Sequence, residues 1–245
     1  MKRCTRAALV ALSLVALLIL GLPGSSATAR GATGYRITIQ NLISGQPLTP
    51  PVVALHRRQL DVFTPGEAAS FEVKEIAENG NIQPLVDLLG EHPSVSDVFA
   101  GEAPLVPRDR QDETGFDDTI TFTLEGGGGA RYLSWVSMLI CTNDGFTGLD
   151  GVALPTQAGQ SVTFFTTGFD SGTEMNTEDF ADIVPPCQAL IGVSSGEPGT
   201  GTSNPAIATD DVIEVHQGIV GGSDLLPEVH DWFDPVAQVV VTATR

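Results

Sequence analysis

Apolar and polar residues alternate near both ends of the chain. Residues 35–42 (Tyr-Arg-Ile-Thr-Ile-Gln-Asn-Leu) and residues 236–243 (Val-Ala-Gln-Val-Val-Val-Thr-Ala) place an apolar side chain at every second position. A period of two is typical of a β-strand with one buried face. We therefore predict a strand in each segment, and we expect the two strands to lie near each other in one sandwich.

Five further segments have the pattern of strands. They are residues 52–56, 119–124, 132–140, 161–167 and 212–216. The glycine-rich residues 125–130 connect the second of these segments to the third. Such a flexible connection predicts a hairpin between residues 119–124 and residues 132–140.

Helical patterns are confined to one region. Ser70 is placed to cap a helix over residues 71–78, which Asn79-Gly80 would end, and residues 81–89 predict a second short helix that ends at Gly90. Long loops rich in Gly, Pro, Ser and Asp cover residues 102–118, 166–186 and 193–211. The predicted fold class is all-β: an antiparallel β-sandwich with a short helical insertion and long acidic loops.

The first 29 residues have the features of an export signal. Lys2, Arg3 and Arg6 precede an apolar run, and Ala27-Thr28-Ala29 supplies the small residues of a cleavage site. We predict a signal peptide at residues 1–29, one domain at residues 30–245, and a secreted, extracellular or periplasmic location. The length of the apolar run leaves an uncleaved anchor as the alternative. No later stretch approaches the ~18 apolar residues of a spanning helix, so no transmembrane span is expected after cleavage.

Charge and cysteine content narrow the choice of partner and compartment. The whole chain carries a net charge of −18, and removal of the predicted signal takes away three basic and no acidic residues, which leaves about −21. A field of this sign repels nucleic acid, so no nucleic-acid partner is expected. Cys141 and Cys187 remain after export, and in an oxidising compartment such an isolated pair predicts a disulfide.

Carboxylates gather in two short segments that each follow an apolar run. The segments are Cys141-Thr-Asn-Asp-Gly-Phe-Thr-Gly-Leu-Asp150 and Phe169-Asp-Ser-Gly-Thr-Glu174. Carboxylates on neighbouring loops repel one another unless a cation lies between them, and Ca²⁺ is the hard cation that prefers oxygen ligands. The other interpretation is that each carboxylate only caps a turn.

The order of these segments resembles the spondin N-terminal domain. The resemblance rests on residues 35–42, Pro51-Val-Val-Ala-Leu-His56, Ser137-Met-Leu-Ile-Cys-Thr-Asn-Asp-Gly-Phe-Thr-Gly-Leu-Asp150, Phe169-Asp-Ser-Gly-Thr-Glu-Met-Asn-Thr-Glu178, and His216-Gln-Gly-Ile with Trp232. It covers nearly the whole chain after the predicted signal. It implies an antiparallel β-sandwich that holds a calcium ion, similar to the calcium-binding domain of the F-spondins.

The resemblance also implies which residues bind the ion. Three carboxylates hold it in the animal members of the family, and the matching positions here are Asp144, Asp170 and Glu174. Glu174 stands where the animal proteins have Asp, and the flexible shell of Ca²⁺ tolerates the longer side chain. Gly145 replaces an aromatic residue, and the thrombospondin repeats of the animal proteins are missing from this sequence. Asn143 and Asp150 are the alternative ligands.

Two histidines and a serine motif have residue types found in functional sites, but we expect them to have structural roles. His56 and His216 each end a predicted strand, where a histidine is expected to bond a loop carbonyl. Gly192-Val-Ser-Ser-Gly196 matches the nucleophile elbow of serine hydrolases, but a Gly- and Pro-rich stretch follows where that motif needs a helix, so we treat the match as chance.

Together these features predict a secreted calcium-binding β-sandwich module that is not an enzyme. Its expected role is extracellular or cell-surface interaction, with a cell-surface glycan, an anionic lipid or a matrix protein as partner. The alternatives are a secreted structural domain with a stabilising ion only and, less favoured, a secreted hydrolase.

Overall fold

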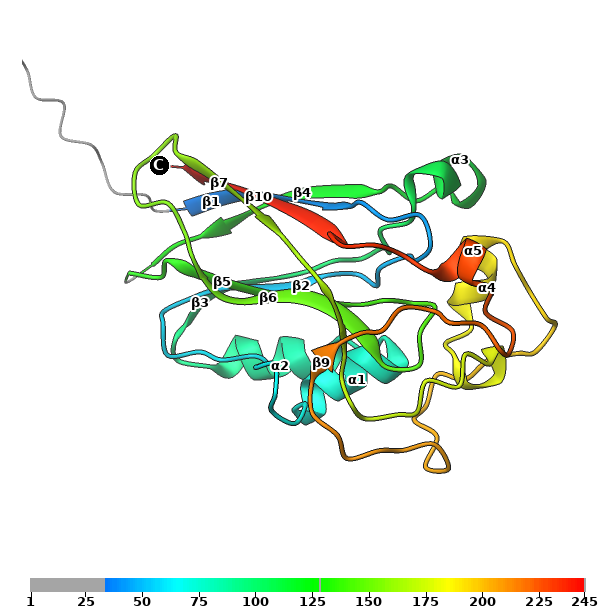
Figure 1. Ribbon diagram of the computed structural model, residues 1–245. Helices are drawn as coiled ribbons and strands as arrows, with labels where there is room; N and C mark the ends of the chain where they lie inside the picture. Colours follow the sequence, from blue (N-terminus) through cyan, green and yellow to red (C-terminus); the bar gives the residue numbers. More distant parts are fainter. Residues whose placement is uncertain (1–33, 128, 245) are drawn as a thin grey trace, which may run out of the picture.

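The predicted antiparallel β-sandwich is confirmed by the computed structural model, which describes residues 34–127 and 129–244 (Figure 1). The predicted signal peptide lies outside the described residues. One sheet has four strands in the order β4-β1-β10-β7, and the other has six in the order β3-β2-β5-β6-β8-β9. The strands are β1 (Gly34–Asn41), β2 (Val52–His56), β3 (Val95–Ala100), β4 (Thr119–Glu125), β5 (Tyr132–Met138), β6 (Gly145–Ala153), β7 (Ser161–Phe165), β8 (Gly168–Asp170), β9 (Glu214–Val215) and β10 (Ala237–Thr244).

The two terminal strands pair with each other, as their matching alternation predicts. β1 and β10 run antiparallel from the Gly34–Thr244 pair to the Asn41–Ala237 pair. The apolar residues of both strands, among them Ile37 and Val241, face the other sheet and are fully buried. The two ends of the described chain are therefore neighbours at the centre of the four-stranded sheet.

The predicted hairpin is wrong, because its two strands lie in different sheets. β4 pairs with β1, whereas β5 pairs with β2 and β6. β5 is buried along nearly its whole length and needs neighbours on both edges, while β4 is half-exposed and occupies the edge of its sheet. The glycine-rich connection thus carries the chain from one sheet to the other.

Two strands were missed because glycine lies inside them or next to them. β6 begins at Gly145, within the segment that was interpreted as a loop, and β8 is a three-residue strand that begins at Gly168. Glycine is depleted in strands, so the pattern argued against one here. A Cβ atom at Gly148 would lie 2.3 Å from the carbonyl oxygen of Trp135, so β6 requires glycine to pack against β5. β3, the edge strand beside β2, was also missed.

The predicted helices form and cover the outer face of the six-stranded sheet (Figure 1). α1 (Phe71–Asn79) begins at Ser70, whose side chain accepts from the N–H of Val73, and ends at Gly80 in a left-handed conformation (φ 64°). α2 (Gln83–Glu91) follows, and Gly90 lies inside it instead of ending it. The shorter helices are α3 (Gln111–Thr114), α4 (Pro186–Ile191) and α5 (Pro227–His230), with single turns at Arg108–Arg110 and Phe180–Asp182.

Two apolar cores result from this layering. One lies between the sheets and contains Ile37, Trp135 and Val239, and the other lies between the six-stranded sheet and the helices and loops. The predicted disulfide between Cys141 and Cys187 is confirmed, with Cα atoms 5.0 Å apart, and it joins the end of β5 to α4 inside the second core.

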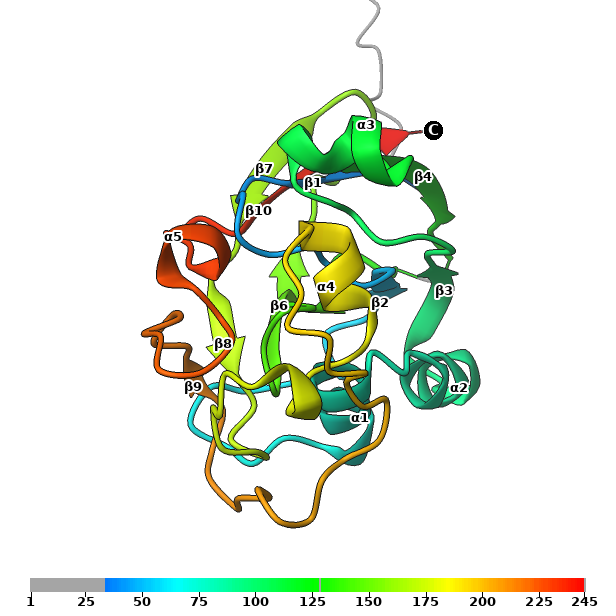
Figure 2. The same ribbon diagram turned by 90° about the vertical axis from the view of Figure 1, so that its right-hand side faces the viewer.

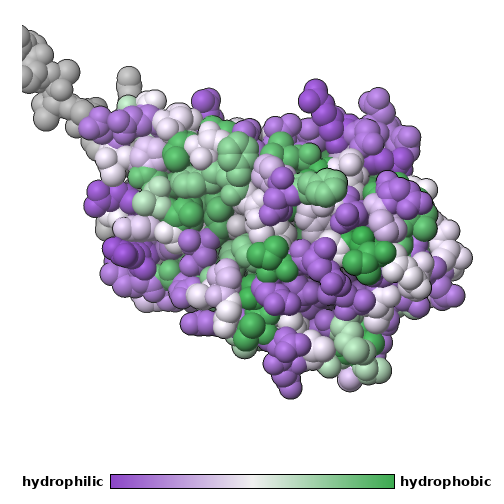
Figure 3. Space-filling view, in the orientation of Figure 1, coloured by the Kyte–Doolittle hydropathy of each residue, from purple (hydrophilic) through white to green (hydrophobic). Residues whose placement is uncertain are grey.

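The surface is mixed, and among the apolar areas that Figure 3 shows, a broad one lies over the β7 edge of the sandwich. Phe165 of β7 is 56% exposed there, and Val162 and Phe164 are only partly covered. None of the helices that the structure describes is both apolar and long enough to span a bilayer.

The glycine requirement of β6 leads to a first prediction. Gly148→Ala would force a Cβ atom against the Trp135 carbonyl, and we expect it to lower the free energy of unfolding by about 1–3 kcal/mol. The matched control is Gly90→Ala in α2, where a Cβ meets nothing within 4 Å. We expect that control to raise stability by about 0.5–1 kcal/mol. Denaturant unfolding of both variants measures the difference, and equal effects would contradict the packing of β5 on β6.

Candidate metal centre

The two acidic segments meet at one end of the six-stranded sheet. Asp144 lies in the turn between β5 and β6, and Asp170 is the last residue of β8. β6 and β8 are antiparallel neighbours, and Gly145 is directly opposite Asp170. The sheet therefore brings together the turn before β6 and the loop after β8, as the sandwich prediction requires.

Asp144 is fully buried and only half of its carboxylate has partners. Its Oδ2 accepts hydrogen bonds from the Ser171 hydroxyl (3.0 Å), the Thr173 N–H (2.8 Å) and the Glu174 N–H (3.0 Å). Its Oδ1 has no hydrogen-bond partner. Burial, followed by the negative charge of Asp170, raises the pKa of Asp144 to about 6. A buried carboxylate oxygen without a partner favours uptake of either a proton or a cation.

Asp170 and Glu174 lie in the loop above Asp144 and are partly satisfied by the protein. Asp170 accepts from the Gly172 N–H (2.8 Å) and from the Asn176 side chain (2.6 Å). Glu174 accepts from the Asn204 N–H (2.9 Å). Burial raises the pKa of Glu174 to about 7, and the nearby negative charges, of which the first is Glu78, act in the same direction.

Four carboxylates line a polar cavity of about 360 Å³ over this end of the sheet. Asp170 and Glu174 are two of them, and Asp211 and Glu214 are the others. Asp211 lies in the segment that leads into β9 and Glu214 begins that strand, and neither was predicted as a ligand. The sequence signal for these residues was the Asp210-Asp211 dipeptide directly before a predicted strand. That strand contains β9, which pairs with β8 and so brings the dipeptide beside Asp170.

The oxygen donors around the acidic cavity suit a hard cation, but in this structure they do not converge on one point. The donor atoms on this cavity are mostly carboxylate oxygens, which is the chemistry that Ca²⁺ prefers. Among the described residues, however, Asp144, Asp170 and Glu174 do not form a set whose oxygens all lie within 4.8 Å of one another. The side chains of Asp170 and Glu174 bond to Asn176 and Asn204 instead. An ion held by all three would require these two side chains to turn toward Asp144.

The structure places the alternative ligands in other roles. The side chain of Asn143 donates to the Thr177 hydroxyl (3.0 Å) and accepts from the Glu178 N–H (3.3 Å), so it orders the loop. Asp150 accepts from the Val62 N–H and from the Ser134 hydroxyl, both at 2.8 Å. Neither residue lines the acidic cavity, and the fully buried Asp144 is not part of its lining either.

The two strand-end histidines are far apart in the sheet and differ in their bonding. His56 Nδ1 lies 2.6 Å from the carbonyl oxygen of Arg57, as expected. His216 instead accepts from the Gly218 N–H (3.0 Å), which corrects the expected carbonyl bond. Three strands separate β2, which ends at His56, from β9, which precedes His216.

The serine motif lacks the geometry of a nucleophile elbow. Gly192 ends α4, so the motif follows a helix instead of connecting a strand to one. Ser194 is exposed and donates to Gln188 of the same helix.

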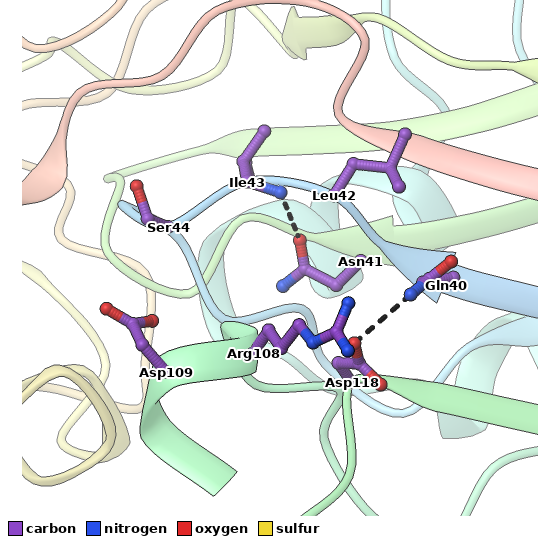
Figure 4. Close-up of a pocket in the computed structure, with 8 residues that line it drawn as sticks. All are labelled: Gln40, Asn41, Leu42, Ile43, Ser44, Arg108, Asp109 and Asp118. Atoms are coloured by element: carbon purple, nitrogen blue, oxygen red, sulfur yellow. Dashed lines mark hydrogen bonds between the residues drawn. The ribbon is translucent and has the colours of Figure 1, made fainter.

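A second cavity, of about 390 Å³, lies at the corner where β1 ends (Figure 4). In the close-up, the side chain of Gln40 donates to Asp118 (3.2 Å) and Asn41 accepts from the Ile43 N–H (3.1 Å). These two bonds fix the turn that follows β1, which gives Gln40, Asn41 and Asp118 a structural role. The acidic cavity remains the stronger candidate.

No protein-family model matches this chain, and a search of curated proteins finds no matching sequence. The family resemblance therefore stays a prediction that rests on the quoted motifs.

The raised pKa of Glu174 predicts a specific pH dependence in the metal-free protein. A group whose pKa is higher in the folded state contributes stability below its unfolded pKa, near 4.5, which is lost as the pH rises through about 7. Relative to the wild type, Glu174→Gln should therefore gain about 2 kcal/mol in free energy of unfolding between pH 4.5 and pH 7.5.

Denaturant unfolding in the presence of a chelator at several pH values measures this difference. Burial lowers the pKa values of His56, His216 and His230, which gives both proteins a shared opposite trend that cancels in the comparison. A difference that stays constant with pH would show that Glu174 has an ordinary pKa.

Proposed function

We propose that this chain is an exported calcium-binding β-sandwich module of the spondin type that acts in extracellular or cell-surface binding. The observation that carries the proposal is the fully buried Asp144 with an unpartnered Oδ1, set beside Asp170 beneath an acidic cavity. A divalent cation is the ligand class that compensates such a buried charge without a proton.

In this proposal each of the three carboxylates has a distinct part. Asp144 would hold the ion through its free Oδ1, and Asp170 and Glu174 would hold it from the loop after turning away from Asn176 and Asn204. Backbone carbonyls and waters complete the six to eight positions that Ca²⁺ takes. The ion supplies the positive charge that neutralises this end of the molecule.

Neutralising these charges has a direct consequence for the loops. The segment at residues 171–176 and the segment at residues 207–214 bond to each other, as in Met175 N–H to the Ile207 carbonyl (2.8 Å) and Thr209 N–H to the Thr173 carbonyl (2.9 Å). Both segments carry carboxylates that face the same cavity. Bound calcium would therefore hold both loops in one arrangement.

The charge of the chain indicates how a partner would bind. An acidic protein repels anionic surfaces unless a divalent cation bridges the contact. A cell-surface glycan with acidic groups, an anionic lipid headgroup or an acidic matrix protein would each supply oxygen ligands to an exposed ion. The resemblance to the spondin N-terminal domain supports this extracellular setting.

Calcium binding itself is tested by calorimetric titration of the purified protein, with thermal melting alongside. We expect one site and a rise in melting temperature, because an ion that binds only the folded state stabilises it. Asp170→Asn should abolish both effects. Asp112→Asn, which removes one exposed carboxylate from α3, is the matched control and should leave both unchanged. Heat without a defined stoichiometry, or equal loss in both variants, would reduce the acidic loops to ordinary turns.

A second measurement separates a binding module from a domain whose ion only stabilises it. Co-sedimentation with vesicles that contain phosphatidylserine, and binding to immobilised acidic glycans, are each compared with calcium and with chelator. We expect binding to one of these surfaces with calcium and its loss in Asp170→Asn. Calcium-dependent melting without any calcium-dependent binding would favour the structural alternative.

A further inference from the structure

A second group of metal-binding side chains lies inside the core, away from the acidic cavity. Cys141 follows β5, Cys187 lies in α4 and His230 ends α5. The two Sγ atoms and a ring nitrogen of His230 all lie within 4.8 Å of one another, and no other group of three such side chains in the described chain does so. All three residues have no solvent exposure. Figure 2 shows α4 and α5 on the same face of the molecule.

His230 has one ring nitrogen engaged and one free. Nδ1 lies 2.9 Å from the backbone nitrogen of Leu226 and 3.2 Å from its carbonyl oxygen, which anchors the ring. Nε2 is buried and has no hydrogen-bond partner. A neutral imidazole binds metals through a free ring nitrogen, and Nε2 is the ring nitrogen without a partner here.

The side chain of Gln46 holds the backbone of two members of this group in place. Its Nε2 donates to the carbonyl oxygens of His230 (2.8 Å) and Cys141 (3.2 Å), and its Oε1 accepts from the Cys141 N–H (2.8 Å). The positions of Cys141 and His230 therefore do not depend on the disulfide alone. Outer contacts of this kind orient the ligands of metal sites.

We propose that the reduced chain binds a zinc ion through Cys141, Cys187 and His230. The same two segments are then joined by a disulfide in oxidising conditions and by the metal in reducing conditions. Two thiolates and one imidazole form a ligand set that zinc favours, with a fourth position left for water, whereas the oxygen donors of the acidic cavity suit calcium. The zinc site is thus independent of the proposed calcium site.

Disulfide reduction comes first, and zinc binding follows it. A trialkylphosphine gives two electrons to the disulfide, the Sγ–Sγ bond breaks, and two thiols form. The phosphine becomes the phosphine oxide, with water supplying its oxygen and the two thiol protons. Zinc then displaces both thiol protons to the solvent and binds the two thiolates and the imidazole.

The experiment uses the purified protein reduced by a phosphine under anaerobic conditions, with Co²⁺ as a spectroscopic probe and Zn²⁺ as its competitor. We expect a thiolate-to-cobalt charge-transfer band that saturates at one ion per chain and that zinc abolishes. The oxidised protein, which has the same acidic surface, should give no band. Zinc should also raise the melting temperature of the reduced protein. It should not raise that of the oxidised protein through this site, because the disulfide occupies both sulfur ligands.

Matched variants identify the third ligand. His230→Gln should weaken zinc binding at least about tenfold, because a direct ligand is lost. His216→Gln is the control, since His216 is also buried with an unpartnered Nε2 but does not belong to the cysteine group. Asp170→Asn should keep zinc binding intact.

Three results would overturn the proposal. They are a reduced protein without the charge-transfer band, a reduced protein that remains unfolded after zinc is added, and equal weakening by the two histidine substitutions. Circular dichroism of each reduced variant distinguishes loss of folding from loss of a ligand.

Discussion

The Asp144 carboxylate supports the loops at one end of the sandwich. Its Oδ2 accepts hydrogen bonds from the Ser171 hydroxyl and from the N–H groups of Thr173 and Glu174. The backbone carbonyl of Asp144 accepts from the Ser171 N–H. The loop after β8 is thereby fixed on the turn before β6. Residues 207–213 then bond to that loop, so two layers of irregular chain rest on one buried side chain.

The same arrangement concentrates negative charge where water cannot screen it well. Glu78 of α1 is also buried, with Lys74 at 3.2 Å, and it raises the pKa of Glu174 together with Asp144. A charged group in such an environment is stable only when a partner is near. The fold therefore leaves this end of the molecule dependent on solution conditions, unlike the apolar core between the sheets.

Much of the sandwich could be predicted from the sequence, because periodicity reports burial of a strand directly. The terminal strands, β2, α1 with its Ser70 cap and the disulfide were all predicted correctly. The pairing of β4 and β5 was not, since strand partners depend on which edges are already occupied. β6 was missed because its glycines are required by close packing on β5, which sequence periodicity does not reveal.

The site was predictable only in part, for a similar reason. Short motifs identified Asp144, Asp170 and Glu174, and the structure places them around one sheet end. Asp211 and Glu214 reach the same cavity through the pairing of β8 with β9, a contact between distant segments. The proximity of His230 to the two cysteines likewise follows from packing, because 43 positions separate it from Cys187 in the chain.

The pairing of β1 with β10 also determines how the domain can be attached to something else. Gly34 and Thr244 face each other, and both views place this end of the sheet at the opposite side of the molecule from the loop at residues 200–213 (Figures 1 and 2). A tether joined directly to Gly34 or to Thr244 would therefore leave from the same end of the sheet. In either case the loop at residues 200–213, which contributes Asp211 to the acidic cavity, would lie on the side of the molecule away from the tether.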